Sequence, residues 1–169
     1  MQKTQTTPRC SRCGSTFVRQ TRPQGPMEYL LSLVHAYPFQ CQVCWRRFTV
    51  RQPGVRQTAH ELDRRQYERL ETSMPVTFSG EMGDGQGVTT DVSLDGCNLR
   101  TSVELSVGTQ LRLQLRAAHE DRPIVVESAV VRSVRSPAVG VQFVQFHLGE
   151  RERLSRLVQK LLNAHRASA

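Results

Sequence analysis

The chain has 169 residues, 38% hydrophobic side chains and a formal net charge of +8. This length suits one domain or two small ones, and the low hydrophobic fraction argues against a single large core. The longest apolar run, from Tyr29 to Phe39, is broken by His35 and Pro38 and is shorter than the roughly 20 residues that cross a bilayer. The first residues lack the apolar stretch of a signal peptide. We therefore expect a soluble, cytoplasmic protein.

The excess positive charge lies in the first third of the chain. Residues 1–58 carry nine Lys and Arg against one acid, Glu28, whereas residues 59–169 carry fourteen of each sign. The composition changes around Pro53 and Gly54, where apolar residues are few, as is typical of a linker. We predict a first module at residues 1–52, a linker at 53–62 and a second domain at 63–169.

Four of the five cysteines form two C-x-x-C pairs in the first module. They are Cys10, Cys13, Cys41 and Cys44. Each pair places two thiolates on one tight turn, and two facing turns make a tetrahedral sulfur cage that suits Zn²⁺. The 27 residues between the pairs exceed the usual ribbon spacing. Two disulfides, which need an oxidising compartment, and a thioredoxin-like redox motif are the alternatives. We favour one structural zinc ion.

The cysteine segment resembles a zinc ribbon. "CSRCGS" is similar to the first knuckle of that family, with Gly14 where the backbone turns back tightly. The second knuckle, "CQVCWRRF", departs from the pattern because Trp45 replaces that glycine. The insertion "MEYLLSLVHAYPFQ" is expected to supply a helical turn and an apolar lid over a module too small for its own core.

Basic and aromatic side chains interleave after the second knuckle. Arg46, Arg47 and Arg51 follow the last cysteine of the pair, with Trp45 and Phe48 among them. Such a pattern suits a nucleic-acid backbone and its bases, so nucleic acid is one expected partner of this module. A solvated positive surface that keeps a small module soluble explains the same charges, and we prefer that explanation.

Short strand patterns dominate the second domain. "QLRLQLR" alternates Leu111, Leu113 and Leu115 with polar residues, and "PIVVESAVVRSV" and "VGVQFVQF" are β-branched runs. The glycine-rich residues 80–87 predict a hairpin loop. Several short strands without intervening helices favour an antiparallel barrel or sandwich. From Glu150, apolar residues at helical spacing predict a closing helix that packs on the barrel, with dimerisation as the alternative.

A short polar stretch at the start of this domain carries Arg64, Arg65 and Arg69. Guanidinium groups this close repel one another unless an anion lies among them. Further along, "DVSLDG" places Asp91 and Ser93 at i and i+2, which project from the same side of a strand. Taken alone, an Asp/Ser turn explains that second pattern best.

The two patterns together resemble the PilZ domain, the bacterial receptor module for cyclic di-GMP. That family is marked by R-x-x-x-R on an N-terminal arm and [D/N]-x-S-x-x-G on a barrel, here Arg65 to Arg69 and Asp91 to Gly96. The later strand patterns extend the resemblance over roughly residues 60–165. The resemblance implies a mainly β fold, a six-stranded antiparallel β-barrel with a C-terminal helix.

The resemblance also implies cyclic di-GMP as the ligand. Its binding residues would be Arg64, Arg65, Arg69, Asp91, Ser93 and Gly96. Guanidinium groups match phosphate oxygens and the guanine edge, while a carboxylate accepts hydrogen bonds from guanine N–H groups. In the family the arm folds over the barrel when ligand binds. Here that movement would shift the attached zinc module and relay the signal to a downstream protein partner.

The sequence does not predict an enzyme. Its five histidines are scattered, and Cys97 is expected to be a buried core thiol. Two alternatives to the receptor function remain at this point. One is a zinc-ribbon regulator that binds nucleic acid, and the other is a protein-interaction adaptor whose barrel no longer binds nucleotide.

Overall fold

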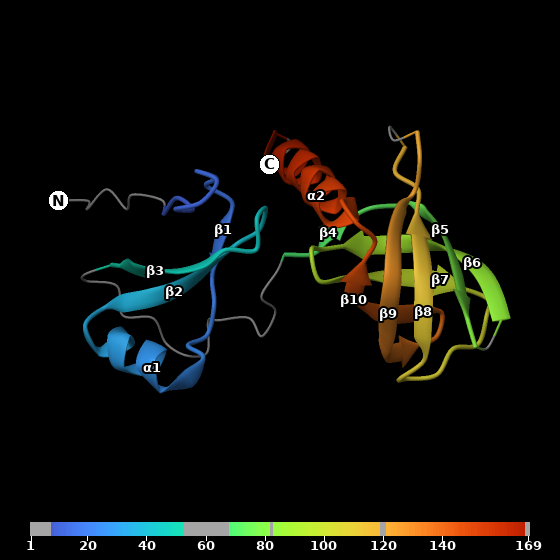
Figure 1. Cartoon of the computed structure of the whole chain (residues 1–169), viewed down its shortest axis with the longest axis horizontal. Coiled ribbons are helices and arrows are strands. Elements are labelled where there is room, and N and C mark those ends of the chain that lie inside the picture. Colours follow the sequence, from blue (N-terminus) through green and yellow to red (C-terminus); the bar gives the residue numbers. More distant parts are fainter. Residues whose placement is uncertain (1–7, 53–67, 82, 119–120, 168–169) are drawn as a thin grey trace. The chain divides into compact units, whose positions relative to one another are not determined.

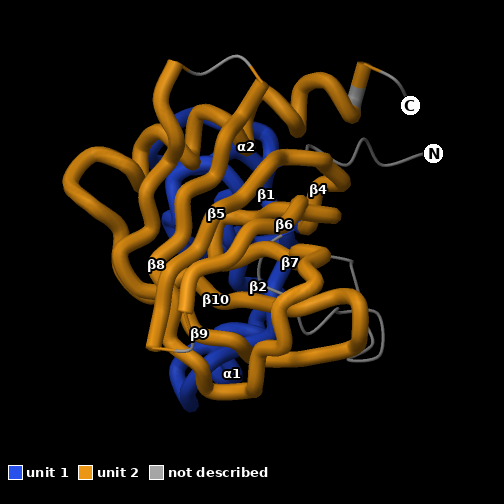
Figure 2. Tube along the Cα trace, turned by 90° about the vertical axis from the view of Figure 1, so that its right-hand side faces the viewer, with its two compact units in different colours: residues 1–68 blue, residues 69–169 orange. Residues whose placement is uncertain are grey.

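The computed structural model describes residues 8–52, 68–81, 83–118 and 121–167. The chain divides into two compact units, residues 1–68 and residues 69–169 (Figure 2). The predicted linker and two of the predicted site residues, Arg64 and Arg65, lie outside the described residues.

The first unit is a small antiparallel sheet with one helix (Figure 1). Its elements are β1 (Val18–Gln20), α1 (Gly25–Leu33), β2 (Ala36–Cys41) and β3 (Arg47–Arg51). The strand order is β1-β2-β3, so β2 is central and most of its side chains are buried. Phe39 of β2 stacks on Phe48 of β3 with ring centroids 6.2 Å apart. These strands and the cysteine cluster at their end confirm a zinc-ribbon-like module.

The insertion between the cysteine pairs forms α1, as predicted, but it is not an apolar lid. None of the side chains of α1 is buried. An ion pair attaches the helix to the sheet instead, because Arg47 of β3 donates to both carboxylate oxygens of Glu28 at 2.8 and 2.6 Å. This pairing lowers the pKa of Glu28 below its ordinary value. Arg47 also donates to the Thr21 hydroxyl and the Arg22 carbonyl, each at 2.8 Å, so it is engaged within the unit.

The described residues of the second unit form seven strands and one helix. They are β4 (Leu70–Glu71), β5 (Pro75–Gly80), β6 (Gly83–Val92), β7 (Gly96–Thr101), β8 (Gln110–Leu115), β9 (Ile124–Arg135), β10 (Ala138–Phe146) and α2 (Glu150–Ala167).

Six of these strands close into an antiparallel barrel, which confirms the predicted fold. The order is β6-β5-β8-β9-β10-β7, and pairing of β7 with β6 closes the ring. The alternation in β8 places Leu111, Leu113 and Leu115 in the core and leaves Arg112 exposed. The short strand β4 adds to β6, with Leu70 opposite Val92.

The hairpin between β5 and β6 is tighter than the glycines suggest. Gly80 pairs directly with Gly83, so the glycines at 83, 85 and 87 belong to β6 and not to a loop. A Cβ atom on Gly85 would lie 2.4 Å from the ring of Phe78, its partner across the strand pair. The glycine therefore makes room for an aromatic ring that would otherwise clash.

The C-terminal helix α2 packs on the barrel through its apolar stripe, as predicted. Leu154, Leu157, Val158 and Leu162 are buried, and the helix lies against β9 and β4. None of the described helices is long and apolar enough to cross a membrane.

Candidate ligand-binding surface and metal centre

The first predicted site residue, Asp91, stands near the end of β6 opposite Asn98 of β7. Asn98 donates to its carboxylate twice, from the backbone N–H at 3.3 Å and from Nδ2 at 2.7 Å. A register shift between Thr89 and Asp91 interrupts the ladder just before this point. Such bulges re-aim side chains, and this one precedes the acid that the motif places on the surface.

The turn after Asp91 is stabilised by the side chain of Ser93, one of its own residues. The Ser93 hydroxyl donates to the Gly96 carbonyl at 3.1 Å and accepts from the Asp95 N–H at 3.4 Å. Ser93 is buried, unlike the half-buried Asp91, so its hydroxyl serves the turn. The backbone of β10 runs close beneath Gly96, where a Cβ atom would lie 2.2 Å from the Val141 carbonyl oxygen. That approach explains why the motif needs glycine.

The arm reaches this turn through β4. Glu71 pairs with Asp91 in this antiparallel ladder, and Arg69, two residues earlier on the same side of the chain, reaches Asp91 diagonally, 22 residues away in sequence. Arg69 Nη1 lies 3.3 Å from Asp91 Oδ1, and the two side chains are 30% and 18% exposed. The structure thus joins one residue of the arginine motif to one residue of the barrel motif.

Further cations gather around the same turn. Burial raises the pKa of Asp95, opposed by a hydrogen bond with Gln142 and by the positive charges of Arg69, Arg132 and Arg151. Arg132 and Arg151 were not predicted from the sequence, because they come from β9 and α2 and no local motif contains them. Three guanidinium groups therefore lie near one backbone turn, together with the carboxylates of Asp91 and Asp95.

A depression in the surface adjoins Asp91. Its lining includes Glu71, Thr72, Ser73, Thr90, Asp91 and Arg100. Arg100 was also missed from the sequence. The alternation within β7, where Cys97 and Leu99 are buried and Asn98 and Arg100 are not, is the signal that could have found it.

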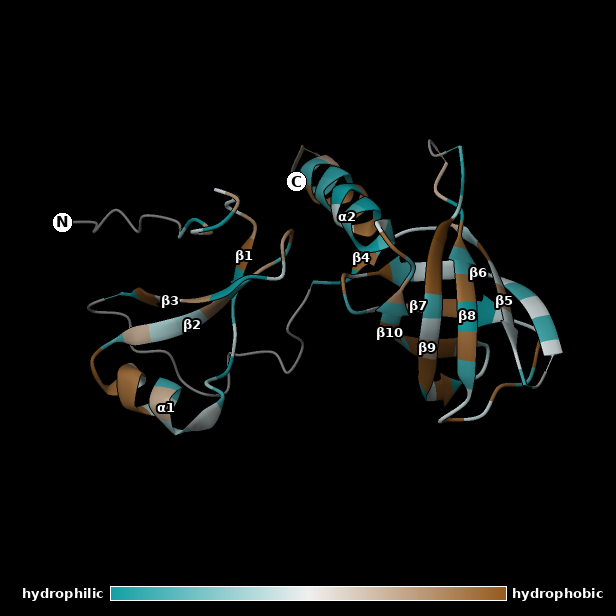
Figure 3. Cartoon of the chain, in the orientation of Figure 1, coloured by the Kyte–Doolittle hydropathy of each residue, from teal (hydrophilic) through white to brown (hydrophobic). Residues whose placement is uncertain are grey.

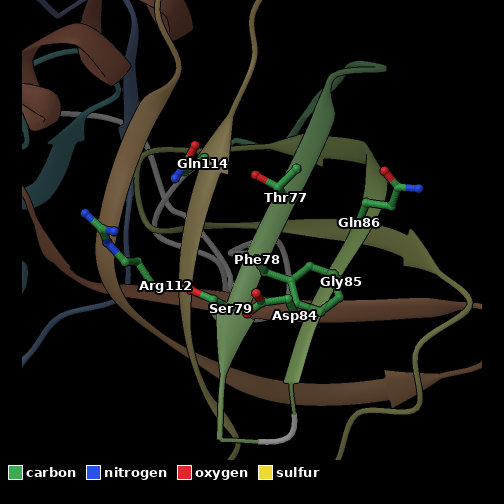
Figure 4. A pocket seen from close by; sticks show the side chains of 8 residues that line it. All are labelled: Thr77, Phe78, Ser79, Asp84, Gly85, Gln86, Arg112 and Gln114. Carbon is green, nitrogen blue, oxygen red and sulfur yellow. The ribbon is translucent and has the colours of Figure 1, made fainter.

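A second depression lies on the outside of β5, β6 and β8 and contains none of the motif residues (Figure 4). Its lining includes Thr77, Ser79, Asp84, Gln86, Arg112 and Gln114. The guanidinium of Arg112 is paired with the Glu127 carboxylate at 2.9 Å. This arginine therefore offers a matched control for the arginines of the candidate site.

The four cysteines of the first unit form a single cluster. Their sulfur atoms all lie within 4.8 Å of one another. Two contacts join the knuckles, because the sulfur of Cys10 lies 3.5 Å from that of Cys44 and the sulfur of Cys13 lies 3.6 Å from that of Cys41. Tetrahedral Zn–S bonds of about 2.3 Å place sulfur atoms about 3.8 Å apart, so the cluster fits that ion.

The two knuckles share one backbone turn despite their different sequences. In each, the first cysteine N–H donates at 2.9 Å to the carbonyl five residues on, Cys10 to Ser15 and Cys41 to Arg46. Gly14 has a φ of 70°, and Trp45 at the corresponding position has a φ of 60°. Trp45 therefore takes the left-handed conformation that glycine adopts freely.

The thiols of the cluster differ in acidity. Burial opposes ionisation of Cys10, but hydrogen bonds, first from the backbone of Cys13 and Arg12, lower the pKa of its thiol to about 7. Burial raises the pKa of Cys41 and of Cys44. A cation among the sulfurs would offset that cost, because a bound metal stabilises thiolates. The donor set therefore fits a zinc ion.

Comparisons with known proteins support the fold of the second unit. A model of the PilZ domain family matches residues 63–160. The Bacillus subtilis inhibitor of motility, MotI/DgrA, is similar with 20% identity and a TM-score of 0.51, over 76% of this chain and 74% of that one. K. pneumonia MrkH is similar with 17% identity and a TM-score of 0.52, over 90% and 78%. No curated protein sequence matches the chain.

Proposed function

Because the chain belongs to the PilZ domain family, we propose that its second unit is a receptor for cyclic di-GMP. The proposal is a binding function without catalysis. The ligand would be held by the arm, through Arg64, Arg65 and Arg69, and by the barrel turn, through Asp91, Ser93 and Gly96.

One observation carries the proposal, the contact between Arg69 and Asp91 at 3.3 Å. It joins a cation suited to phosphate to a carboxylate suited to the guanine N–H groups, on a surface with further positive charge from Arg132 and Arg151. Ser93 and Gly96 would act by shaping the turn, since the serine hydroxyl is bonded within it.

Isothermal titration of the full chain with cyclic di-GMP tests the receptor function. We expect a dissociation constant in the micromolar range or tighter, about −8 kcal/mol. Arg65→Ala and Arg69→Ala should each weaken binding by roughly 1.5–3 kcal/mol, because each removes a charge-assisted contact. Asp91→Ala should weaken it through loss of the guanine acceptor, and Asp91→Asn, which the family motif admits, should weaken it less.

Arg112→Ala is the matched control, because it removes an ion-paired arginine from the same barrel outside the site. It should leave the affinity unchanged. A folded wild-type protein that shows no heat with the ligand, or an equal loss for the Arg112 variant, would contradict the proposal.

The proposal extends to one structural zinc ion held by Cys10, Cys13, Cys41 and Cys44. When bound, the ion would stabilise the thiolates and fasten the two knuckles together. Elemental analysis should find one zinc per chain, and a chelator should unfold the first unit while the melting transition of the barrel persists. Metal-free protein with a folded first unit would argue against the ion.

We propose a bacterial cytoplasmic location for the protein, because reduced thiolates and an intracellular messenger both fit that compartment.

We also propose that ligand binding is relayed through the arm. Glu68 and Arg69 are adjacent in sequence, but each bonds within a different unit. The Glu68 N–H donates to Gln42 Oε1 of the first unit at 2.6 Å, and Arg69 pairs with Asp91 of the second unit. Gln42 lies inside the second knuckle, between two cysteine ligands. A ligand that draws Arg69 from Asp91 would strain the neighbouring bond to the knuckle. Hydrogen exchange at residues 41–44 should change on adding ligand, and unchanged exchange would confine the response to the barrel.

Nucleic acid is a second candidate ligand, proposed for the first unit. Arg46 and Arg51 are exposed and Trp45 is half-exposed, which leaves two cations and one ring at the surface. Arg47 and Phe48 contribute less, because the first is engaged by Glu28 and the second stacks on a core ring. A mobility-shift assay should show binding that weakens steeply with salt and is reduced by Arg46→Gln. Binding insensitive to that substitution would exclude this surface.

A further inference from the structure

The helix α1 turns a mixed side, and not an apolar stripe, toward its sheet. Glu28 meets Arg47 of β3, and Leu31 and Ser32, one turn further along the same side, are half-buried. An ordinary surface helix buries a wider apolar stripe. In α2 the buried stripe against the barrel is made of leucines and a valine, whereas much of α1 is apolar in Figure 3 and none of its side chains is buried.

The outward side of this helix, which we name the α1 apolar face, consists of five large side chains. They are Met27, Tyr29, Leu30, Leu33 and Val34, and each is between 53% and 76% exposed. At 3.6 residues per turn they span a continuous arc of about 160° that contains no charged side chain. Contiguous apolar surface of this kind marks an interaction site, in contrast to single scattered leucines.

Among residues 8–52, the exposed charged side chains next to the α1 apolar face are positive. Arg22 is exposed just before the helix begins, and Arg51 is exposed on β3 opposite Ala36, just after the helix ends. The one acid among residues 8–52 is Glu28, and its charge is matched by Arg47. An apolar ridge with cations at both ends complements a surface that has an apolar interior and negatively charged groups at its boundary with water.

We propose that the α1 apolar face docks on the surface of an anionic phospholipid membrane. The helix is about 13 Å long against a hydrocarbon core of about 30 Å, so it would lie in the interface and not cross it. Leucine, methionine and valine would enter the boundary of the acyl chains, Tyr29 would sit at the headgroup level, and Arg22 and Arg51 would meet the phosphates. Because α1 is already folded on its sheet, docking carries no cost of helix formation.

A membrane fits this face better than a protein groove does. A helix that binds in a groove presents a narrow stripe at positions i, i+3, i+4 and i+7. The α1 apolar face is wider than that, and its cations lie beyond both ends of the helix and not along its sides. An anionic membrane matches both features, because its continuous apolar layer lies beneath a layer of negatively charged headgroups. The inference does not depend on ligand binding by the barrel.

Sedimentation of the zinc-loaded full chain with vesicles tests the proposal. One set contains phosphatidylcholine alone, and the other contains phosphatidylcholine and phosphatidylglycerol in equal parts. We expect binding to the anionic set, weakened by salt. The double substitution Leu30→Ser with Leu33→Ser should weaken it by about tenfold or more, and Arg51→Gln by about fivefold.

Leu148→Ser is the matched control, because it removes a leucine that is 93% exposed on the second unit. It should leave vesicle binding unchanged. A second readout places tryptophan on the face with Tyr29→Trp, whose fluorescence brominated lipids should quench well beyond that of Trp45 in the wild type.

Three results would overturn the proposal. The first is equal vesicle binding by the wild type and the double variant. The second is a dimer in lipid-free solution that the double substitution abolishes, which would assign the face to a second copy of the chain. The third is a lower melting temperature of the barrel in the double variant, which would show that the face already packs within the molecule.

Discussion

Glu150 and Arg153, in the first turn of α2, form an ion pair at 2.8 Å in which each side chain is only 8% exposed. Both partners also bond to the barrel. Glu150 Oε2 accepts from the Val125 N–H at 3.2 Å, and Arg153 donates to the carbonyls of Pro123 and Arg122 at 2.9 and 2.6 Å. The pair therefore fastens the start of α2 to the entry of β9.

Replacing Arg153 with methionine should lower the free energy of unfolding of the second unit by about 3–5 kcal/mol, because it leaves a buried carboxylate without its partner. Urea denaturation followed by circular dichroism measures the change. Arg156→Met, at an exposed position of the same helix, is the control and should cost less than about 0.5 kcal/mol. Adding Glu150→Gln should recover part of the loss, and no recovery would show that the loss does not come from the stranded charge.

A methyl group on Gly96 should destabilise the barrel by about 3 kcal/mol, because its Cβ atom would meet the Val141 carbonyl oxygen of β10. Thermal unfolding measures the change. Gly108→Ala is the comparison, since it has a φ of 93° but nothing within 4 Å, and should cost about 1 kcal/mol through backbone strain alone. Equal costs at the two positions would mean that β10 yields to the new methyl group.

Trp45 allows the cost of a left-handed backbone to be separated from the loss of its ring. Trp45→Gly and Trp45→Ala both remove the ring, but only glycine adopts a φ of 60° freely. We expect the glycine variant to hold zinc about fivefold more tightly than the alanine variant, a difference of about 1 kcal/mol. Competition with a chromophoric chelator measures both affinities. Equal affinities would indicate that the turn relaxes in the variants.

The buried thiol of Cys97 predicts a pH dependence. Burial raises its pKa to about 12, helped by the negative charge of Asp91. The unfolded chain therefore loses this proton first as pH rises above about 9, so the free energy of unfolding should fall with rising pH toward 12. Subtracting the profile of Cys97→Ala isolates the effect, because other groups titrate in both proteins. A constant difference between the two profiles would refute the shift.

The sequence predicted those parts of the fold that depend on local periodicity. The alternation of Leu111, Leu113 and Leu115 indicated a half-buried strand, and the spacing of Leu154 and Val158 indicated the closing helix. These patterns arise because each side chain's face is set by its own strand or helix. The paired cysteines likewise predicted their cluster, since C-x-x-C fixes the geometry of each turn.

What the sequence could not predict depends on partners far apart in the chain. The orientation of α1 follows from Glu28 meeting Arg47, 19 residues later, and hydrophobicity alone predicted the opposite face. The burial of the Ser93 hydroxyl follows from its turn. The positive surroundings of Asp95 need Arg132 and Arg151 from two other elements. The roles of Arg64 and Arg65 remain predictions, because both lie outside the described residues.

Closure of the barrel also determines how a partner could add a strand. Each strand from β5 to β10 has a neighbour on both sides over at least part of its length, so most of its backbone hydrogen-bonding groups are already paired. In the three-stranded sheet of the first unit, β1 and β3 each have a neighbour on one side only among the described strands. Pairing of an extended peptide with a complete edge strand is therefore open to the first unit, whereas each barrel strand is at least partly covered on both sides. Arg51, exposed at the end of β3, places a charge on that edge, which disfavours indiscriminate pairing with other chains.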